Sequence, residues 1–484
     1  MSAQPAITPA PRSERASGLA FWLQQVLEEC VRAGQSFAAD PVHDLRVALR
    51  RCRSIADGLR ALDPDPAWKQ MKKASKRLFD DLGELRDVQV MEEWATKLGA
   101  LDDPVTAALL EILAARENRL KQEAAQALAQ FDQKRWRGWT TYLTRRAARI
   151  RPGGQIFKHL ALERWTAARD LHRRALRNRS AVAFHRLRVG LKRFRYIVEN
   201  FLPAQHAAWS SDLKRLQDAL GEVHDLDVLW ATAVQAKVFP DANSRAHWHQ
   251  RIVEERAKRI EAYREKMLGE TSLWGVWRAQ LPQGEQVRSI GLSRLRLWAS
   301  LLDPHFKHAE HVARLALQLY DGLPASSDNS REERDMLQLA ALLQDVGLSR
   351  KGKAHHKTSQ KLISQLSVPL GWTPEKLKIV AAVARYHRGA LPRKGQKGLL
   401  GFTDQQRETA VRLAAVLRLA NAFDAERDGR IERLACERRN GFLLIRAQAY
   451  NPRDRMAETI AGSRHLLELV YHRPVVVRPL RKAV

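Results

Sequence analysis

The chain has 484 residues and carries 83 Lys or Arg against 54 Asp or Glu, so its formal net charge is +29 at pH 7 and its pI is about 10.5. This length exceeds what one hydrophobic core usually covers, which predicts two domains or more. The charge indicates a polyanionic partner or an acidic surface. No apolar run approaches the roughly 20 residues that span a bilayer, so membrane insertion is excluded and we expect a soluble protein.

The first 14 residues form a Pro/Ala/Ser-rich stretch that we expect to be disordered. No apolar run follows it, so a secretory signal is not expected. The three cysteines, Cys30, Cys52 and Cys436, have no metal-ligand spacing. Free buried thiols in a reducing cytoplasm are the simplest interpretation, and cytoplasmic localisation is the prediction.

Residues 19–277 show apolar positions every three or four residues, which is typical of helices. Pro and Gly interrupt this pattern at 278–292, where we place a domain boundary. Helical text then continues to about Asp428, and 441–449 and 473–480 are predicted to be short strands. The sequence therefore predicts an all-α fold with a small C-terminal α+β element. The predicted parts are a domain at 15–280, a linker at 281–292, a helical domain at 293–430 and the α+β element at 431–484.

The first region repeats itself. Residues 43–53, HDLRVALRRCR, are echoed by residues 185–195, HRLRVGLKRFR, and residues 76–87, KRLFDDLGELRD, are echoed by residues 214–225, KRLQDALGEVHD. The two offsets, 142 and 138, are nearly equal. A duplicated unit explains this better than chance, and its copies fall at about 15–150 and 155–280.

Helix geometry gives the repeat a chemical meaning, because positions i, i+3, i+7 and i+10 lie on one stripe of a helix. The stripes are His43, Arg46, Arg50 and Arg53 in one copy and His185, Arg188, Lys192 and Arg195 in the other. Stacked like charges destabilise a helix unless an anion offsets them. A single basic run is more often a solvated or salt-bridged face, but repetition in register favours an anion site.

Arg supplies planar bidentate donors and Lys a movable charge, which suits a phosphate chain. His43 and His185 could donate when protonated, so affinity is expected to rise as pH falls. Gly83 and Gly221 are expected to permit a turn or a close helix approach. The predicted polyphosphate-binding residues are His43, Arg46, Arg50, Arg51, Arg53, Lys73, Lys76, Arg77, His185, Arg188, Lys192, Arg193, Arg195, Lys214 and Arg215.

Two intact copies of H-x-x-R-V-x-x-[RK]-R-x-R, each followed by a basic and LG-x-x-x-D segment, resemble the CHAD family over about 280 residues. The resemblance implies two pseudo-symmetric helical bundles that meet at a basic central channel, and it implies binding of inorganic polyphosphate. Nucleic acid is a competitor because phosphate contacts dominate its affinity too. Base readout usually needs aromatic platforms, and only Phe194 and Tyr196 lie near either stripe, both off the face.

The second region contains the runs HAEHVARLA, ALLQDVG, HHK, RYHR and LRLANAFD in this order. The order resembles the HD superfamily, and HHKTSQKLI followed by VARYHRGALP is similar to the C-terminal helical domain of exopolyphosphatases and guanosine pentaphosphate phosphatases. In the HD superfamily a first His, a His-Asp doublet and a late Asp hold a metal. Here Gln344 and Asn421 replace two of these four ligands, and neutral amides bind divalent metals poorly.

We therefore predict no metal, no cofactor and no catalytic residue in this region. Its histidines are either ordinary polar residues or phosphate contacts. The possible second phosphate site comprises His308, His355, His356, Lys357, Arg385, His387 and Arg388.

The sequence thus favours non-catalytic polyphosphate binding, with granule association and only non-specific binding of nucleic acid. One alternative is a metal-assisted phosphohydrolase of polyphosphate or a phosphorylated nucleotide that uses His308, Asp345 and His387. Another is a nucleic-acid-binding or granule scaffold protein. The sequence leaves the oligomeric state open.

Overall fold

A computed structural model describes residues 18–99, 102–323, 330–350, 352 and 354–480. The predicted disordered tail at 1–14 lies outside these residues. The chain divides into two compact units: unit 1 is Met1–Ala61 with Asp65–Pro282, and unit 2 is Leu62–Pro64 with Gln283–Val484. Within the described ranges, no helix combines the length and the apolarity needed to cross a membrane.

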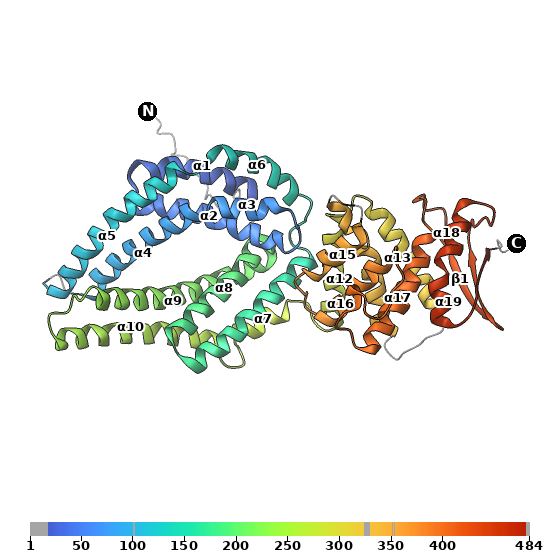
Figure 1. The fold of residues 1–484 in the computed structure, drawn as a ribbon. Helices are drawn as coiled ribbons and strands as arrows, with labels where there is room; N and C mark the ends of the chain where they lie inside the picture. Colours follow the sequence, from blue (N-terminus) through green and yellow to red (C-terminus); the bar gives the residue numbers. More distant parts are fainter. Residues whose placement is uncertain (1–17, 100–101, 324–329, 351, 353, 481–484) are drawn as a thin grey trace, which may run out of the picture. The chain divides into compact units, whose positions relative to one another are not determined.

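Unit 1 is helical throughout the residues described (Figure 1). Its first six helices are α1 (Leu19–Ser36), α2 (Ala39–Arg60), α3 (Pro66–Ala74), α4 (Lys76–Leu98), α5 (Pro104–Ala129) and α6 (Gln133–Ala147). The next five are α7 (Gln155–Asn178), α8 (Ala181–Phe201), α9 (Pro203–Gln235), α10 (Ala242–Met267) and α11 (Leu273–Ala279). The two sequence copies thus become two successive sets of helices.

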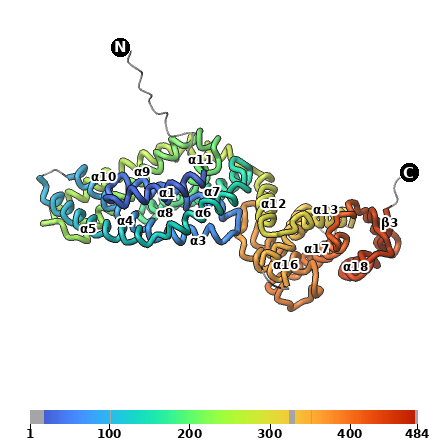
Figure 2. Tube along the Cα trace, turned by 90° about the horizontal axis from the view of Figure 1, so that it is seen from above, coloured from blue at the N-terminus to red at the C-terminus, as the bar shows by residue number. Residues whose placement is uncertain are grey.

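The two sets pack in the same way. α1 packs on α2 and α7 on α8, while α4 pairs with α5 and α9 with α10. Figure 1 shows the pairs α4–α5 and α9–α10 as long hairpins, and Figure 2 shows the same four helices from above, at one end of unit 1. The sets meet through α2 against α8 and α4 against α9. The repeated basic segments therefore lie on the helices that join the two halves of unit 1.

Close packing fixes the α2–α8 contact. A Cβ atom on Gly58 would lie 2.3 Å from the Phe201 ring, so glycine allows the ends of the two helices to touch. Asn200 donates to the Ser54 hydroxyl across the same contact at 3.1 Å. The α8 helix begins after Ser180, whose side chain accepts from the Ala183 amide. Most tryptophans are buried in the core, as their positions in helical text suggest.

Unit 2 starts with helices. They are α12 (Glu285–Ser300), α13 (Phe306–Gly322), α14 (Ser330–Leu343), η1 (Val346–Ser349), α15 (His355–Ser364), α16 (Pro374–Tyr386), η2 (Lys397–Leu399) and α17 (Asp404–Ala422). Its last elements are β1 (Leu434–Arg439), β2 (Phe442–Ala447), α18 (Arg455–Ser463), α19 (His465–Tyr471) and β3 (Val475–Pro479). The core of unit 2 centres on α17, which packs against α13, α14, α16, α18 and α19.

The three strands form one sheet in the order β1-β2-β3. β1 is antiparallel to β2 and β3 is parallel to β2. The strands predicted at 441–449 and 473–480 correspond to β2 and β3, whereas β1 was not predicted. Its sequence LACERR ends in charged, exposed residues, as an edge strand permits, and therefore lacks a strand-like apolar pattern.

The predicted class, all-α with a small C-terminal α+β element, is confirmed. The predicted linker at 281–292 is wrong in its extent, because α12 already begins at Glu285. The break between α11 and α12 is confined to residues 280–284, and Gly284 adopts a positive φ of 52°. The residues after it form the first helix of unit 2, which includes Gly291, where a Cβ atom would lie 2.9 Å from the Trp372 ring.

Candidate functional site

The basic stripes of α2 and α8 converge where the two halves of unit 1 meet. Arg46 and Arg50 of α2 and Arg188 and Lys192 of α8 are half-buried and close enough to influence one another electrostatically. Among the described residues, no carboxylate forms an ion pair with any of these four. The structure thus assembles a group of four cations, called the central cluster below, from both copies of the repeat.

Burial lowers the pKa of the Arg46 guanidinium, and the nearby cations Arg50 and Arg188 lower it further. The effect on Lys192 is larger, because burial together with Arg188 and Arg50 lowers the pKa of its ammonium to about 7. The Nε atom of Arg188 is buried and has no hydrogen-bond partner among the described residues. Such a crowded cation group is costly without an anion, which makes it a candidate anion site.

Two carboxylates, Asp87 of α4 and Asp225 of α9, face the central cluster. Burial raises the pKa of both, to about 6 for Asp225, although Arg188 opposes the shift at each. They end the second echo of the repeat, but sequence reasoning gave them no role. Their identical position in the two copies is the signal that could have found them.

Gly83 and Gly221 lie inside helices α4 and α9, so of the two expected roles, a turn or a close helix approach, the structure leaves the close approach. A Cβ atom on Gly83 would lie 2.9 Å from Nη1 of Arg46. Its absence lets the Arg46 guanidinium lie on α4 and donate to the Leu82 carbonyl at 2.7 Å. Gly221 leaves more room, since its added Cβ would be 4.0 Å from Nε of Arg188.

The two histidines that begin the stripes differ. His43 is exposed beside Asp44, with Nδ1 3.4 Å from Oδ1. His185 instead lies against His224, their Nδ1 atoms 3.3 Å apart. Burial and the charge of Arg188 lower the pKa of both rings, to about 4 for His224. The sequence gave His224 no role, and it precedes Asp225 in the second echo.

Several other predicted residues have structural partners. Arg51 forms an ion pair with Glu199 and lies 5.4 Å from the centre of the Trp22 ring, and Arg195 is 3.8 Å from the same Glu199. Arg53 donates to the Lys72 carbonyl at 2.7 Å, where α3 ends. These contacts hold helices together at the end of the stripe.

The remaining predicted residues of unit 1 are exposed. Lys76 and Arg215 have nearby acidic partners at 3.9 and 2.9 Å, and Arg77 is 3.6 Å from Asp81. None of the three is among the main causes of the lowered pKa of Arg46 or Lys192, which places them at the periphery of the cluster at most. The exposed residues are Lys73, Lys76, Arg77, Arg193, Lys214 and Arg215.

In unit 2, the four positions that would hold a metal in an HD-type site do not fit one. Nδ1 of His308 faces Oδ2 of Asp424 at 2.6 Å, and its Nε2 faces Oδ1 of Asn421 at 3.1 Å. Gln344 donates to the same Asn421 oxygen at 3.3 Å. With Nδ1 donating to Asp424, the lone pair of His308 lies on Nε2 and faces the Asn421 amide. The four positions therefore offer a divalent metal one imidazole nitrogen and the Asp345 carboxylate, with neutral amides at the other two places.

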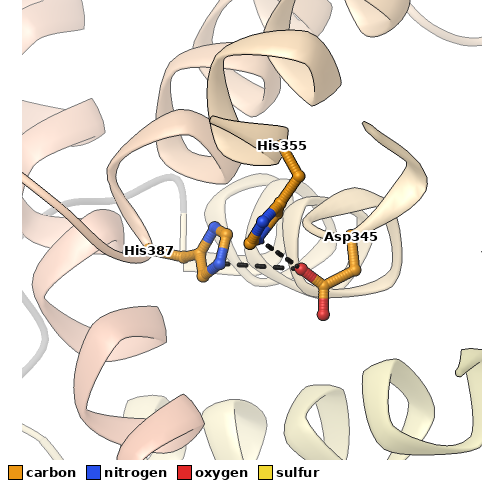
Figure 3. A group of neighbouring side chains, drawn as sticks. All are labelled: Asp345, His355 and His387. Atoms are coloured by element: carbon orange, nitrogen blue, oxygen red, sulfur yellow. Dashed lines mark ion pairs between the residues drawn. The ribbon is translucent and has the colours of Figure 1, made fainter. Parts of the chain in front are cut away.

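A different cluster forms beside it, from Asp345, His355 and His387 (Figure 3). Oδ1 of Asp345 lies 3.1 Å from Nε2 of His355 and 3.7 Å from Nε2 of His387. All three side chains are buried. Burial lowers the pKa of His387 to about 4, whereas contacts with His355 and His387 overcome burial and lower the pKa of Asp345 to about 2.

A cavity of about 270 Å³ opens beside this cluster. Of the possible second phosphate site, His308, His387 and Arg388 line the cavity, and Arg418 and Arg427 add charge that the prediction missed. His355 faces Asp345, and His356 is half-buried beside Gly389. Among the described residues that line the cavity, Lys357 and Arg385 are absent. Lys357 is exposed, and Arg385 donates to Gln360 at 2.9 Å.

Comparison with known families agrees with this division. Residues 19–234 match the family described as CHAD domain, and residues 299–451 match the one described as Ppx/GppA phosphatase, domain III. A solved structure titled as the CHAD domain from the plant Ricinus communis is 21% identical, with a TM-score of 0.38, over 55% of this chain and 94% of that chain. No curated protein matches the chain.

Proposed function

Because the chain carries a CHAD domain and a Ppx/GppA domain III, which together indicate a polyphosphate-related protein, we propose that it binds inorganic polyphosphate at the central cluster of unit 1 without hydrolysing it. The main support is the central cluster itself. Arg46 and Arg50 lie close to Arg188 and Lys192, and none of these four cations forms an ion pair with a carboxylate among the described residues. Each stripe is roughly 15 Å long, given the helical rise. A phosphate chain between the two stripes would supply the missing negative charge along this length.

The basic cavity of unit 2, with Arg388 and Arg418, supports a second phosphate contact on the same polymer. Two linked sites raise the effective concentration at the second, so a long chain would bind more tightly than a short one. As part of the same proposal, we place the protein in the cytoplasm with polyphosphate granules.

We expect polyphosphate to displace single-stranded DNA from the protein at matched salt and matched phosphate concentration. Phe194 is buried against Trp209 and Trp277, and Tyr196 is half-buried, so neither offers a platform for bases. Each stacked base contributes about 1–3 kcal/mol in proteins that use such platforms. DNA should therefore bind at least about 10-fold more weakly in a fluorescence competition assay. Equal affinities at several salt concentrations would instead favour a nucleic-acid-binding or scaffold role.

We also expect no hydrolysis. The full chain incubated with long-chain polyphosphate and Mn²⁺ or Mg²⁺ should release no more orthophosphate than a protein-free control. The physical reason is that neutral amides stand at two of the four HD-type positions, and Gln344 and Asn421 are hydrogen-bonded to each other. Turnover that disappears in Asp345→Ala would contradict this and support a metal-assisted phosphohydrolase.

A further inference from the structure

Three side chains of unit 2 that could bind a metal converge on one point. Asp345 is one of the four HD-type positions, and the other two, His355 and His387, are not. The ligand atoms of Asp345, His355 and His387 all lie within 4.8 Å of one another (Figure 3). Two atoms that each lie about 2.1 Å from one metal at tetrahedral or octahedral angles are about 3.0–3.4 Å apart. The observed separations of 3.1 and 3.7 Å from Oδ1 of Asp345 match this spacing after a small inward shift of His387.

The hydrogen bonds of His387 fix which nitrogen faces the cluster. Its Nδ1 donates to the Ala384 carbonyl at 2.7 Å, so Nε2 points its lone pair toward Oδ1 of Asp345. A lone pair that faces a carboxylate is unfavourable unless a cation lies between them. Ligand histidines in metal sites use the same bond from the far nitrogen to a backbone carbonyl.

The contact between Asp345 and His355 also favours a cation between the two side chains. Although Oδ1 and Nε2 are 3.1 Å apart, they do not meet at a hydrogen-bonding angle. Both are buried atoms without a hydrogen-bond partner among the residues the structure describes. Buried polar atoms are rarely left so, and a shared ion would satisfy both.

Local packing holds His355 in this position. Gly347, in η1 just after Asp345, donates its amide to the Ser359 hydroxyl at 2.9 Å, and that hydroxyl donates to the Gln344 carbonyl at 2.7 Å. A Cβ atom on Gly347 would lie 2.1 Å from the His355 carbonyl oxygen. The start of α15 is thereby packed against the segment that carries Asp345.

We propose that Asp345, His355 and His387 bind one divalent first-row transition ion, of the Zn²⁺, Mn²⁺ or Fe²⁺ class, whose open coordination positions take a phosphate oxygen. A carboxylate and two imidazoles are typical ligands of this class and leave positions free. Asp345 and His387 line the cavity of about 270 Å³, a volume large enough for several waters or a phosphate group. Arg388, Arg418 and Arg427 also line it and supply charge for an anion, and Nη2 of Arg427 is 3.6 Å from the other Asp345 oxygen.

The test uses the full chain, freed of metal with a chelator and titrated with Zn²⁺ and separately with Mn²⁺. Calorimetry and elemental analysis after desalting should give one ion per chain. Loss of an outer partner of a metal ligand already costs about 10- to 100-fold in affinity, so His355→Gln and His387→Gln should each cost at least about 100-fold. The matched control is His311→Gln, which also removes a buried imidazole of unit 2, one that donates to the Ile431 carbonyl at 2.9 Å, and it should bind normally.

X-ray absorption of the Zn²⁺-loaded wild type keeps the test decisive if a variant misfolds. Two imidazoles and one carboxylate oxygen in the ligand shell are expected. No stoichiometric ion, an ion retained by both folded variants, or a loss caused only by His308→Gln would each overturn the assignment. Inorganic phosphate should bind the metal-loaded protein more tightly than the metal-free protein, and equal binding would overturn the phosphate part. The central cluster takes no part in this test, so polyphosphate binding in unit 1 is judged separately.

Discussion

Changing the four residues of the central cluster to glutamine is expected to weaken binding of long-chain polyphosphate by at least about 100-fold while leaving helical content unchanged. Hydrogen bonds to charged groups contribute about 1.5–3 kcal/mol each, so loss of two of them already gives this factor. Glutamine is preferred to a charge reversal because new carboxylates would lie beside Asp87 and Asp225, whose own ionisation burial already disfavours. The measurement is a titration at two salt concentrations, with circular dichroism as the check on folding.

A control with the same change in charge separates this site from general attraction. Lys134, Arg137, Arg145 and Arg149 are exposed residues of α6 and the turn after it. Their fourfold glutamine variant should lose only the long-range part of the attraction, which salt screens. Equal losses in both variants at high salt would show that net charge, and not the central cluster, binds the polymer.

The sequence predicted the stripes of unit 1 because helix periodicity is local and the repeat placed the same residue types twice. It could not predict which members meet. Arg46, Arg50, Arg188 and Lys192 come together only because α2 packs against α8. Arg195 and Glu199 have the i,i+4 spacing of a helical ion pair, but the pairing of Arg51 with Glu199 joins α2 to α8, and no spacing rule predicts it.

In unit 2 the order of motifs predicted an HD-like domain, and the replaced positions Gln344 and Asn421 are indeed hydrogen-bonded to each other. The convergence of His355 and His387 on Asp345 was not predictable from spacing. One imidazole begins α15 and the other follows α16, so their meeting depends on how α15 packs on η1 and α16. Sequence reasoning therefore considered the four HD-type positions and did not bring Asp345, His355 and His387 together.

Polyphosphate affinity is expected to be nearly constant just below pH 7 and to fall above it, by up to about 10-fold per pH unit. Burial and neighbouring cations lower the pKa of Lys192 to about 7 in the free protein. A bound anion favours the charged ammonium and raises this pKa again. Between the two pKa values the complex holds a proton that the free protein has lost, so affinity decreases as pH rises. Proton uptake on binding, measured by calorimetry in two buffers with different ionisation enthalpies, checks this directly.

The variant Lys192→Arg isolates the group responsible, because arginine stays charged over this range. Its affinity should stay nearly constant from pH 7 to pH 9, whereas a fall like that of the wild type would assign the effect to another residue. The facing groups His185, His224 and Asp225 titrate lower, with pKa values of about 4 for His224 and about 6 for Asp225. A further rise in affinity at acid pH should therefore survive in Lys192→Arg. The sequence predicted this increase in affinity at acid pH from the histidines. The structure adds a separate decrease in affinity above pH 7, which depends on Lys192.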